Sequence, residues 1–148
     1  MTRVGVLDWG IGGVDALDRL RRLRPDLDLV YHSDAGTTPY GRLSRDALAS
    51  RVSEVVAGLG VDLVVVACNA ASTVLGELDL RVPAIGVIEP GLEAALATEH
   101  RVLGLVGGER TIASGVWERP LVRAGRRVVA RAAQPLSAHV EAGRLEGP

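Results

Sequence analysis

The stretch Leu63-Val64-Val65-Val66-Ala67-Cys68-Asn69-Ala70-Ala71-Ser72 decides the fold of this chain. Its first five residues form the most apolar run in the sequence and are rich in β-branched valine, which is typical of a strand covered on both faces. The residues that follow Cys68 predict a short helix from Ala70 to Leu78. A buried strand that leads into a helix indicates an α/β fold, with this strand in the interior of a parallel sheet.

Strands and helices alternate on both sides of this stretch. The apolar runs predict five further strands, at 4–7, 27–31, 84–88, 102–106 and 128–132. The spacing of apolar residues predicts helices at 14–23, 48–59 and 111–123, with another at 92–98 after the break at Pro90-Gly91. We therefore expect an α/β fold: a mainly parallel, doubly wound sheet flanked by helices, followed by the start of a second, similar lobe.

The charged segment Glu99-His100-Arg101 marks the expected boundary between the lobes. Residues 1–98 would form the first α/β lobe, which bears Cys68, and residues 99–148 a partial second lobe.

The composition excludes several classes of function. The 148 residues carry a formal net charge of -1 with no basic stripe, so nucleic acid is not expected as a partner. All 17 basic residues are arginine, so the chain has no lysine for a pyridoxal-phosphate Schiff base or a Walker-type phosphate loop. The single cysteine allows neither an internal disulfide nor a cysteine-based zinc site, which fits the cytoplasm. No leader or membrane span is recognised, and no metal is expected.

Polar loops follow four of the predicted strands. These loops are Asp8-Trp9-Gly10-Ile11-Gly12-Gly13, Thr38-Pro39-Tyr40-Gly41, Cys68-Asn69-Ala70-Ala71-Ser72 and Glu89-Pro90-Gly91. Parallel strands end at the same edge of a sheet, and ligands of such folds bind beyond that edge. The four loops therefore predict one site.

Cys68 is the candidate reactive group of this site. A thiol between a buried strand and a helix N-terminus meets backbone N–H groups and the positive end of the helix dipole, so we expect a lowered pKa. The alternative is that Cys68 is a small, buried hydrophobic side chain with a structural role only. For Asp8 the alternative is a carboxylate that stabilises its glycine-rich turn, and for Tyr40 it is a turn residue after Pro39. Glu89 is interpreted as a residue that caps a helix or as an ordinary acidic residue of a loop.

In their order and spacing, these loops resemble those of glutamate racemases in the aspartate/glutamate racemase family. Those enzymes carry Asp-Ser-Gly-x-Gly-Gly, Pro-Tyr-Gly, Cys-Asn-Thr-Ala-Ser and Glu-Pro-Gly, and a weaker similarity continues at 111–115 and near 135–143. The resemblance implies an isomerase, a cofactor-independent amino-acid racemase. It would interconvert L- and D-glutamate in the cytoplasm for peptidoglycan synthesis, and so for cell-wall biogenesis and cell shape.

The resemblance also implies roles for single residues. Cys68 would be one proton donor and acceptor, with Asp8 as the second catalytic residue. The expected substrate-binding positions are Asp8, Trp9, Tyr40, Gly41, Asn69 and Ala70. The substrate would be glutamate or aspartate, without a cofactor or membrane contact. A homodimer or a complementing chain is left open.

The sequence departs from the family in two respects. Trp9 stands where the family has serine and Ala70 where it has threonine, which removes two hydroxyl groups expected to bind the substrate. The family's second catalytic cysteine lies in a later Gly-Cys-Thr-His segment, which these 148 residues do not contain. We therefore expect reduced activity from this stretch alone. Two alternatives stay open: a pseudoenzyme that binds a ligand or a protein, and a relative of one-cysteine decarboxylases.

Overall fold

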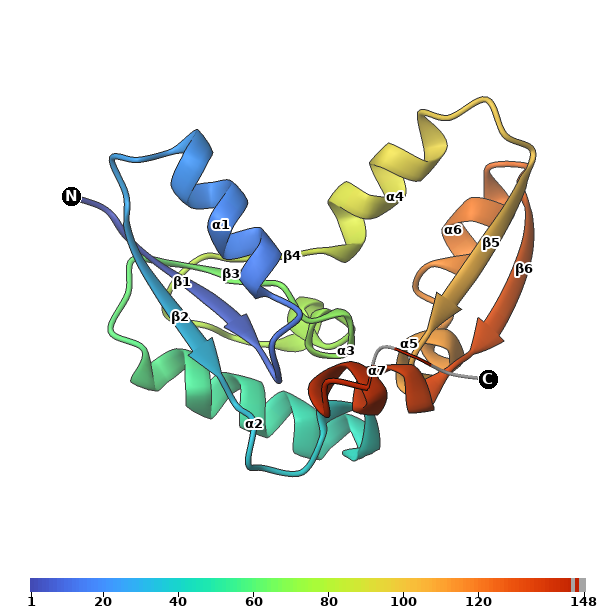
Figure 1. Ribbon diagram of the computed structural model, residues 1–148. Coiled ribbons are helices and arrows are strands. Elements are labelled where there is room, and N and C mark those ends of the chain that lie inside the picture. Colours follow the sequence, from blue (N-terminus) through green and yellow to red (C-terminus); the bar gives the residue numbers. More distant parts are fainter. Residues whose placement is uncertain (145, 147–148) are drawn as a thin grey trace. The chain divides into compact units, whose positions relative to one another are not determined.

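The computed structural model describes residues 1–144 and 146, so the end of the predicted second lobe, at 145 and 147–148, lies outside the described residues. The chain divides into two compact units, Met1–Val87 and Ile88–Pro148. The first contains β1 (Arg3–Asp8), α1 (Val14–Leu23), β2 (Asp28–Ser33), η1 (Tyr40–Arg42), α2 (Arg45–Gly58), β3 (Leu63–Val66), α3 (Asn69–Ser72), η2 (Leu75–Glu77) and β4 (Ala84–Gly86) (Figure 1). The second contains α4 (Ile88–Leu96), β5 (Val102–Gly107), α5 (Glu109–Ser114), α6 (Glu118–Arg123), β6 (Arg127–Ala132) and α7 (Gln134–Glu141).

The first unit is built on a parallel sheet. In the described part of the chain its strand order is β2-β1-β3-β4, and every neighbouring pair is parallel. β1 and β3 are the interior strands, and the side chains of Val6, Leu7, Val64 and Val66 on them are fully buried. The predicted α/β class with a helix-flanked parallel sheet is therefore confirmed, as is the interior position of the valine-rich strand.

The helix α2 supplies most of the apolar surface that covers one face of this sheet. Its N-terminus is capped by the Ser44 hydroxyl, which accepts the N–H of Ala47 at 3.2 Å. Its buried side chains are Leu48, Val52, Val55 and Val56. The helix α1 lies on the opposite side of the sheet (Figure 1) and contributes no buried side chain. The core of the unit therefore lies mainly between the sheet and α2.

The second unit contains a parallel pair of strands, β5 and β6. The guanidinium of Arg126, the residue before β6, donates hydrogen bonds to the carbonyls of Leu96, Thr98 and His100, at 3.0, 2.8 and 2.9 Å. These bonds join the end of α4 to β6, and α4 also contacts α6. For this reason α4 groups with the second unit, and the observed boundary lies earlier in the chain than the predicted one after residue 98.

The prediction of a single helix at 111–123 was wrong. The structure has two short helices there, because Gly115 adopts a left-handed conformation with φ of 63° and ends α5. Its N–H donates to the Ile112 carbonyl at 3.1 Å. A left-handed residue after a helix is a common C-terminal stop, and glycine adopts it without a Cβ penalty.

Two other helix boundaries also differ from the prediction. α4 begins at Ile88 rather than near residue 92, because Pro90 lies in its first turn, where a missing N–H costs no helical hydrogen bond. The strand before it accordingly ends at Gly86. The helix predicted from Ala70 to Leu78 is divided into α3 and the 3₁₀ turn η2.

Substitution of Gly91 by alanine should destabilise the second unit. A Cβ at this position of α4 would overlap the ring of Trp117, with three ring atoms as its nearest neighbours. Since overpacking a close contact typically costs about 1–3 kcal/mol, we expect a loss of that size in the free energy of unfolding. Urea titration followed by Trp117 fluorescence in a Trp9→Phe background measures it.

The matched control is Gly58→Ala in α2, where a Cβ meets no atom within 4 Å. Alanine is the better helix former, so this variant should unfold at an equal or higher urea concentration. A Gly91→Ala variant as stable as its parent would show that the contact between α4 and Trp117 is not tight.

Candidate active site

The pairing of β1 with β3 brings Asp8 and Cys68 together at the carboxyl edge of the sheet. Leu7 is aligned with Val66, and the N–H of Ala67 donates to the Leu7 carbonyl at 2.8 Å. Asp8 ends β1 and Cys68 follows β3, so both occupy the same edge. Their side chains are close enough for the Asp8 carboxyl group to influence the thiol directly.

Burial, together with the negative charge of Asp8, raises the pKa of the Cys68 thiol to about 12 and thereby favours the protonated form. The N–H groups of Ala71 and Trp9 donate to the sulfur and partly oppose this rise. In this structure Cys68 is therefore a thiol at neutral pH, available as a proton donor.

The expectation of a lowered pKa for Cys68 was therefore wrong. It rested on the dipole of the following helix, but α3 has only four residues, Asn69–Ser72, and few peptide dipoles are aligned in so short a helix. Loss of water around the sulfur and the neighbouring carboxylate both act in the opposite direction. Neither can be seen in the local sequence around the cysteine.

Asp8 is 8% exposed and organises the glycine-rich turn after β1. Its Oδ2 atom accepts the N–H of Gly13 at 3.0 Å. The alternative considered for this residue, stabilisation of its own turn, is thus present in the structure. The same carboxyl group acts on the thiol of Cys68, so Asp8 links the turn to the candidate reactive group.

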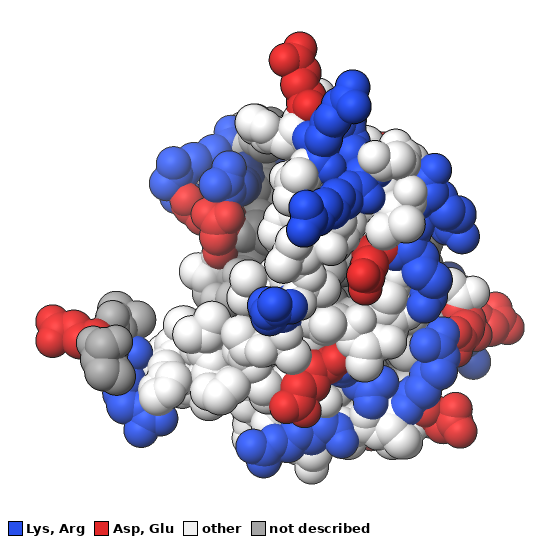
Figure 2. Space-filling view, turned by 90° about the vertical axis from the view of Figure 1, so that its right-hand side faces the viewer, with Lys and Arg blue, Asp and Glu red and all other residues white. Residues whose placement is uncertain are grey.

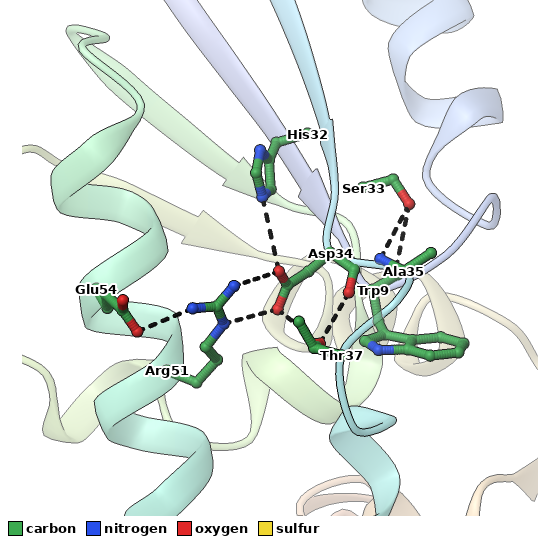
Figure 3. A network of polar contacts seen from close by, with 8 residues as sticks. All are labelled: Trp9, His32, Ser33, Asp34, Ala35, Thr37, Arg51 and Glu54. Carbon is green, nitrogen blue, oxygen red and sulfur yellow. Dashed lines mark hydrogen bonds and ion pairs between the residues drawn. The ribbon is translucent and has the colours of Figure 1, made fainter.

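Trp9 and Ala70, like Cys68, are partly buried at the margin of the apolar core. Both side chains pack against the core cluster, as Cys68 does. The backbone of Trp9 is held from both sides: its carbonyl accepts the Ser33 hydroxyl at 3.2 Å, and its N–H donates to the sulfur. The indole Nε1 is buried without a hydrogen-bond partner among the described residues (Figure 3). The surroundings of Cys68 therefore combine one carboxylate with apolar surface.

A second buried carboxylate, Asp34, holds the loop after β2 (Figure 3). Asp34 is 4% exposed, and Arg51 of α2 binds both its oxygens, with Nη2–Oδ1 at 2.6 Å and Nε–Oδ2 at 2.9 Å. The Thr37 hydroxyl donates to Oδ2 at 3.1 Å, and His32 Nε2 lies 3.9 Å from Oδ1. Arg51 also donates to Glu54 at 2.9 Å. The Arg51 guanidinium holds the pKa of Asp34 below its usual value, so this carboxyl stays ionised.

This network also holds Tyr40. The Tyr40 side chain is 1% exposed and belongs to the core, and burial together with the Asp34 carboxylate raises its pKa. The charge that Cys68 carries when ionised raises it as well. Gly41, in η1, is partly exposed, and Asn69, the first residue of α3, is exposed. The substrate-binding roles assigned to these residues remain predictions.

Sequence reasoning missed Arg51 as a partner of the site. A signal was present, because Leu48, Arg51, Val52 and Val55 recur at the spacing of one helix face. An arginine inside such an apolar stripe needs an acidic partner. The partner is Asp34, 17 residues earlier, and its identity required the fold.

Residues 1–144 and 146 contain neither a metal-binding cluster nor a membrane-spanning helix. No group of three or more His, Cys, Asp or Glu side chains is arranged to hold a metal ion there. No helix in the same residues has the length and apolar character needed to cross a lipid bilayer.

Substitution of Asp8 by asparagine should lower the pKa of Cys68. Asparagine keeps an oxygen for the Gly13 N–H but removes the negative charge that raises the thiol pKa. We expect faster alkylation by iodoacetamide at mildly alkaline pH and a thiolate absorbance that appears at lower pH. The control is Asp15→Asn, which removes one negative charge from an exposed position on α1. It should change neither the alkylation rate nor the pH at which the thiolate absorbance appears. An unshifted titration in Asp8→Asn would exclude the proposed coupling.

Substitution of Asp34 by asparagine should lower the free energy of unfolding by about 2 kcal/mol at neutral pH, because two charge-assisted hydrogen bonds to Arg51 are lost. The folded-state pKa of Asp34 is depressed. Its stabilisation is therefore fully present above the unfolded pKa of about 3.9 and is lost as the pH falls through the folded value. The difference between the two proteins should accordingly shrink in acid.

The control for this substitution is Asp26→Asn, which breaks the exposed ion pair with Arg24. Exposed pairs contribute little, so no measurable change is expected. Chemical denaturation across a pH series measures the free energy of unfolding of the wild type, Asp34→Asn and Asp26→Asn. A difference between wild type and Asp34→Asn that stays constant into acid would contradict the assignment.

Three comparisons identify what the chain is similar to. The profile of the Asp/Glu/Hydantoin racemase family matches residues 24–147. Glutamate racemase of Aquifex aeolicus is 38% identical over 152 aligned residues, which cover 98% of this chain and 60% of that protein. The solved structure of glutamate racemase from Aquifex pyrophilus superposes with a TM-score of 0.85 at 37% identity and covers 98% of this chain and 60% of that one.

Escherichia coli glutamate racemase, solved in complex with L-glutamate and the activator UDP-MurNAc-ala, has a TM-score of 0.81 at 28% identity. That match covers 96% of this chain and 57% of the other. The chain thus spans about 60% of the length of the curated relatives it matches first. Its loops, its parallel sheet and the family profile agree, and the chain belongs to the Asp/Glu/Hydantoin racemase family.

Proposed function

We propose that this chain carries one half of the acid–base machinery of a cofactor-independent amino-acid racemase, with Cys68 as the group that exchanges the α-proton. The observation that carries the proposal is the setting of Cys68: its sulfur lies beside the Asp8 carboxylate and accepts N–H groups from Trp9 and Ala71. A sulfur that both holds a proton and is solvated by N–H donors can serve as acid and as base.

Asp8 couples the ionisation of Cys68 to substrate binding. An amino acid carries an ammonium group, and the Asp8 carboxylate is an anion next to the thiol. An ammonium bound at Asp8 offsets the negative charge that raises the thiol pKa, so the thiolate becomes easier to form when a substrate is present. In the free chain, the loss of water around the partly buried Cys68 side chain and the charge of Asp8 keep the thiol protonated.

The chemical step is a proton transfer between carbon and sulfur. The thiolate of Cys68 takes the α-proton: the C–H bond breaks, the S–H bond forms, and the electron pair stays on the substrate, delocalised into its carboxylate. Return of the proton by the same thiol restores the original stereochemistry, because Cys68 reaches the α-carbon from one face only. Inversion needs a second donor on the other face, and this sequence holds no other cysteine.

Glutamate is the proposed substrate and peptidoglycan synthesis in the cytoplasm the proposed setting. The support is the set of relatives, which are glutamate racemases at 32–41% identity. Trp9 and Ala70 pack against the apolar core and carry no hydroxyl group, so we expect weaker binding of glutamate than in a site lined with hydroxyl groups.

A second candidate function is a binding module without catalysis. It is favoured by one observation, the high pKa of Cys68 in the free chain. In that case Asp8 and the N–H groups around the sulfur would hold an amino acid, and the thiol would remain protonated throughout.

Exchange of the α-proton in deuterated water distinguishes the two functions. The pure 148-residue chain is incubated with each enantiomer of glutamate and aspartate, and deuterium at the α-carbon is measured by mass spectrometry alongside chiral chromatography. We expect deuterium in one enantiomer of glutamate, without appreciable inversion. Cys68→Ser should abolish exchange, because a hydroxyl is a far weaker acid than a thiol.

The control variant is Ser50→Ala, a change of an exposed residue on α2 to which no role in the site is assigned, and it should exchange at the wild-type rate. Binding of glutamate without exchange would favour the binding module. Efficient Cys68-dependent inversion by this chain would overturn the one-face argument and show that another residue completes the site.

A further inference from the structure

Asp34 is the residue through which the loop after β2 is tied to both β1 and α2. Its backbone N–H donates to the Asp8 carbonyl at 3.1 Å, at the end of β1. Its carboxylate binds Arg51 of α2 through both oxygens and accepts the Thr37 hydroxyl at 3.1 Å (Figure 3). One residue therefore joins the carboxyl edge of the sheet to a helix and to its own loop.

The same carboxylate faces the hydroxyl group of Tyr40. Tyr40 is the first residue of η1, and its side chain is 1% exposed. Burial and the Asp34 carboxylate raise the pKa of Tyr40, and Arg51 together with the Tyr40 hydroxyl lowers the pKa of Asp34. These two shifts are those expected where a phenol donates to a carboxylate.

Tyr40 also connects this network to the candidate reactive group. The turn η1 contacts α3, the short helix that begins directly after Cys68. Tyr40 belongs to the apolar core cluster, and Cys68 packs against the same cluster. A displacement of Tyr40 would therefore change the surroundings of the thiol.

The charges around Asp34 differ from those on the surface. Figure 2 shows arginine and acidic side chains spread over one face of the molecule, where water and salt weaken their interactions. The Asp34 side chain is only 4% exposed, and that of Arg51 is 31% exposed. Because the planar guanidinium binds both carboxylate oxygens, the pair has one preferred geometry. Asp34 is thereby fixed in its orientation toward Tyr40.

We propose that Asp34 is a positioning residue of the candidate site. Oriented by Arg51, it holds Tyr40, and with it η1, against α3. This contact keeps water away from the thiol of Cys68. The inference rests on the proposed function in one respect: Gly41, the residue after Tyr40, is expected to bind the substrate, so a displaced η1 would weaken substrate binding. Asp34 acts through Tyr40 and takes no part in the proton transfer.

The first measurement is the alkylation of Cys68 by iodoacetamide in the full chain. Tyr40→Phe removes the hydroxyl group and keeps the ring in the core, and Asp34→Asn removes the charge that this group faces. Both variants should react at least about tenfold faster than the wild type, the factor that corresponds to the loss of a hydrogen bond to a charged group. Tyr40→Phe leaves no charge unpaired, so it carries the test even if Asp34→Asn does not fold.

Three comparisons separate positioning from a general loss of stability. Val56, a core residue of α2 that is 4% exposed and has no polar side chain, is the control. Val56→Ala should lower the free energy of unfolding and still react at the wild-type rate under native conditions. The double variant of Asp34→Asn with Tyr40→Phe should react no faster than the faster single variant, because the two residues act through one contact. In NMR spectra of ¹³C-tyrosine-labelled protein, the Tyr40 ring signal should shift in Asp34→Asn but not in Val56→Ala.

The second measurement is the dependence of α-proton exchange on glutamate concentration in deuterated water. In Asp34→Asn and in Tyr40→Phe, KM should rise while kcat changes much less, because neither substitution alters a group that touches the reacting atoms. A fall in kcat at an unchanged KM would contradict the proposal and indicate a role in the chemical step.

Several further results would overturn the proposal. These are an alkylation rate that neither variant increases, additive effects in the double variant, and an equal increase in Val56→Ala. A wild-type chain that exchanges no proton would contradict the proposed function alone. The alkylation rates and the Tyr40 signal would still decide whether Asp34 positions Tyr40, since neither requires a substrate.

Discussion

The pairing of β1 with β3 is the constraint on which the candidate site depends. Their register aligns Leu7 with Val66, and the bond from the Ala67 N–H to the Leu7 carbonyl extends the pairing to the end of the sheet. Side chains alternate between the faces of a strand, so a shift by one residue would move Asp8 away from Cys68. The buried valines prevent such a shift, because it would expose them. An apolar core thereby sets the distance between two polar groups.

The high pKa of Cys68 follows from the same arrangement. Bringing a thiol and a carboxylate together at a buried edge favours the protonated sulfur, and a local helix of four residues does not outweigh this. For a residue proposed to exchange a proton, the state of the free chain matters less than the change that a bound ammonium group brings. Under the proposed function, the site is a thiol whose ionisation depends on what is bound beside Asp8.

Buried polar contacts hold the loops around this edge. The bidentate contact between Arg51 and Asp34 fixes the loop after β2 to α2, and Tyr40 packs into the core next to it. Ionic contacts of this kind need matched partners, because an isolated charge in such surroundings would be strongly destabilising. The second unit differs, because the side chains of Val102, Val106 and Val129 on β5 and β6 are exposed to solvent rather than packed in a core.

The sequence by itself determined the α/β class, the six strands and the interior place of the valine-rich strand, because apolar periodicity and β-branched residues report directly on burial. It also placed Asp8, Tyr40 and Cys68 at one edge, since parallel strands end on the same side. Only the tertiary structure decided the direction of the Cys68 pKa and the pairing of Arg51 with Asp34. Both depend on desolvation and on distances between residues far apart in the chain, and local sequence carries no record of either.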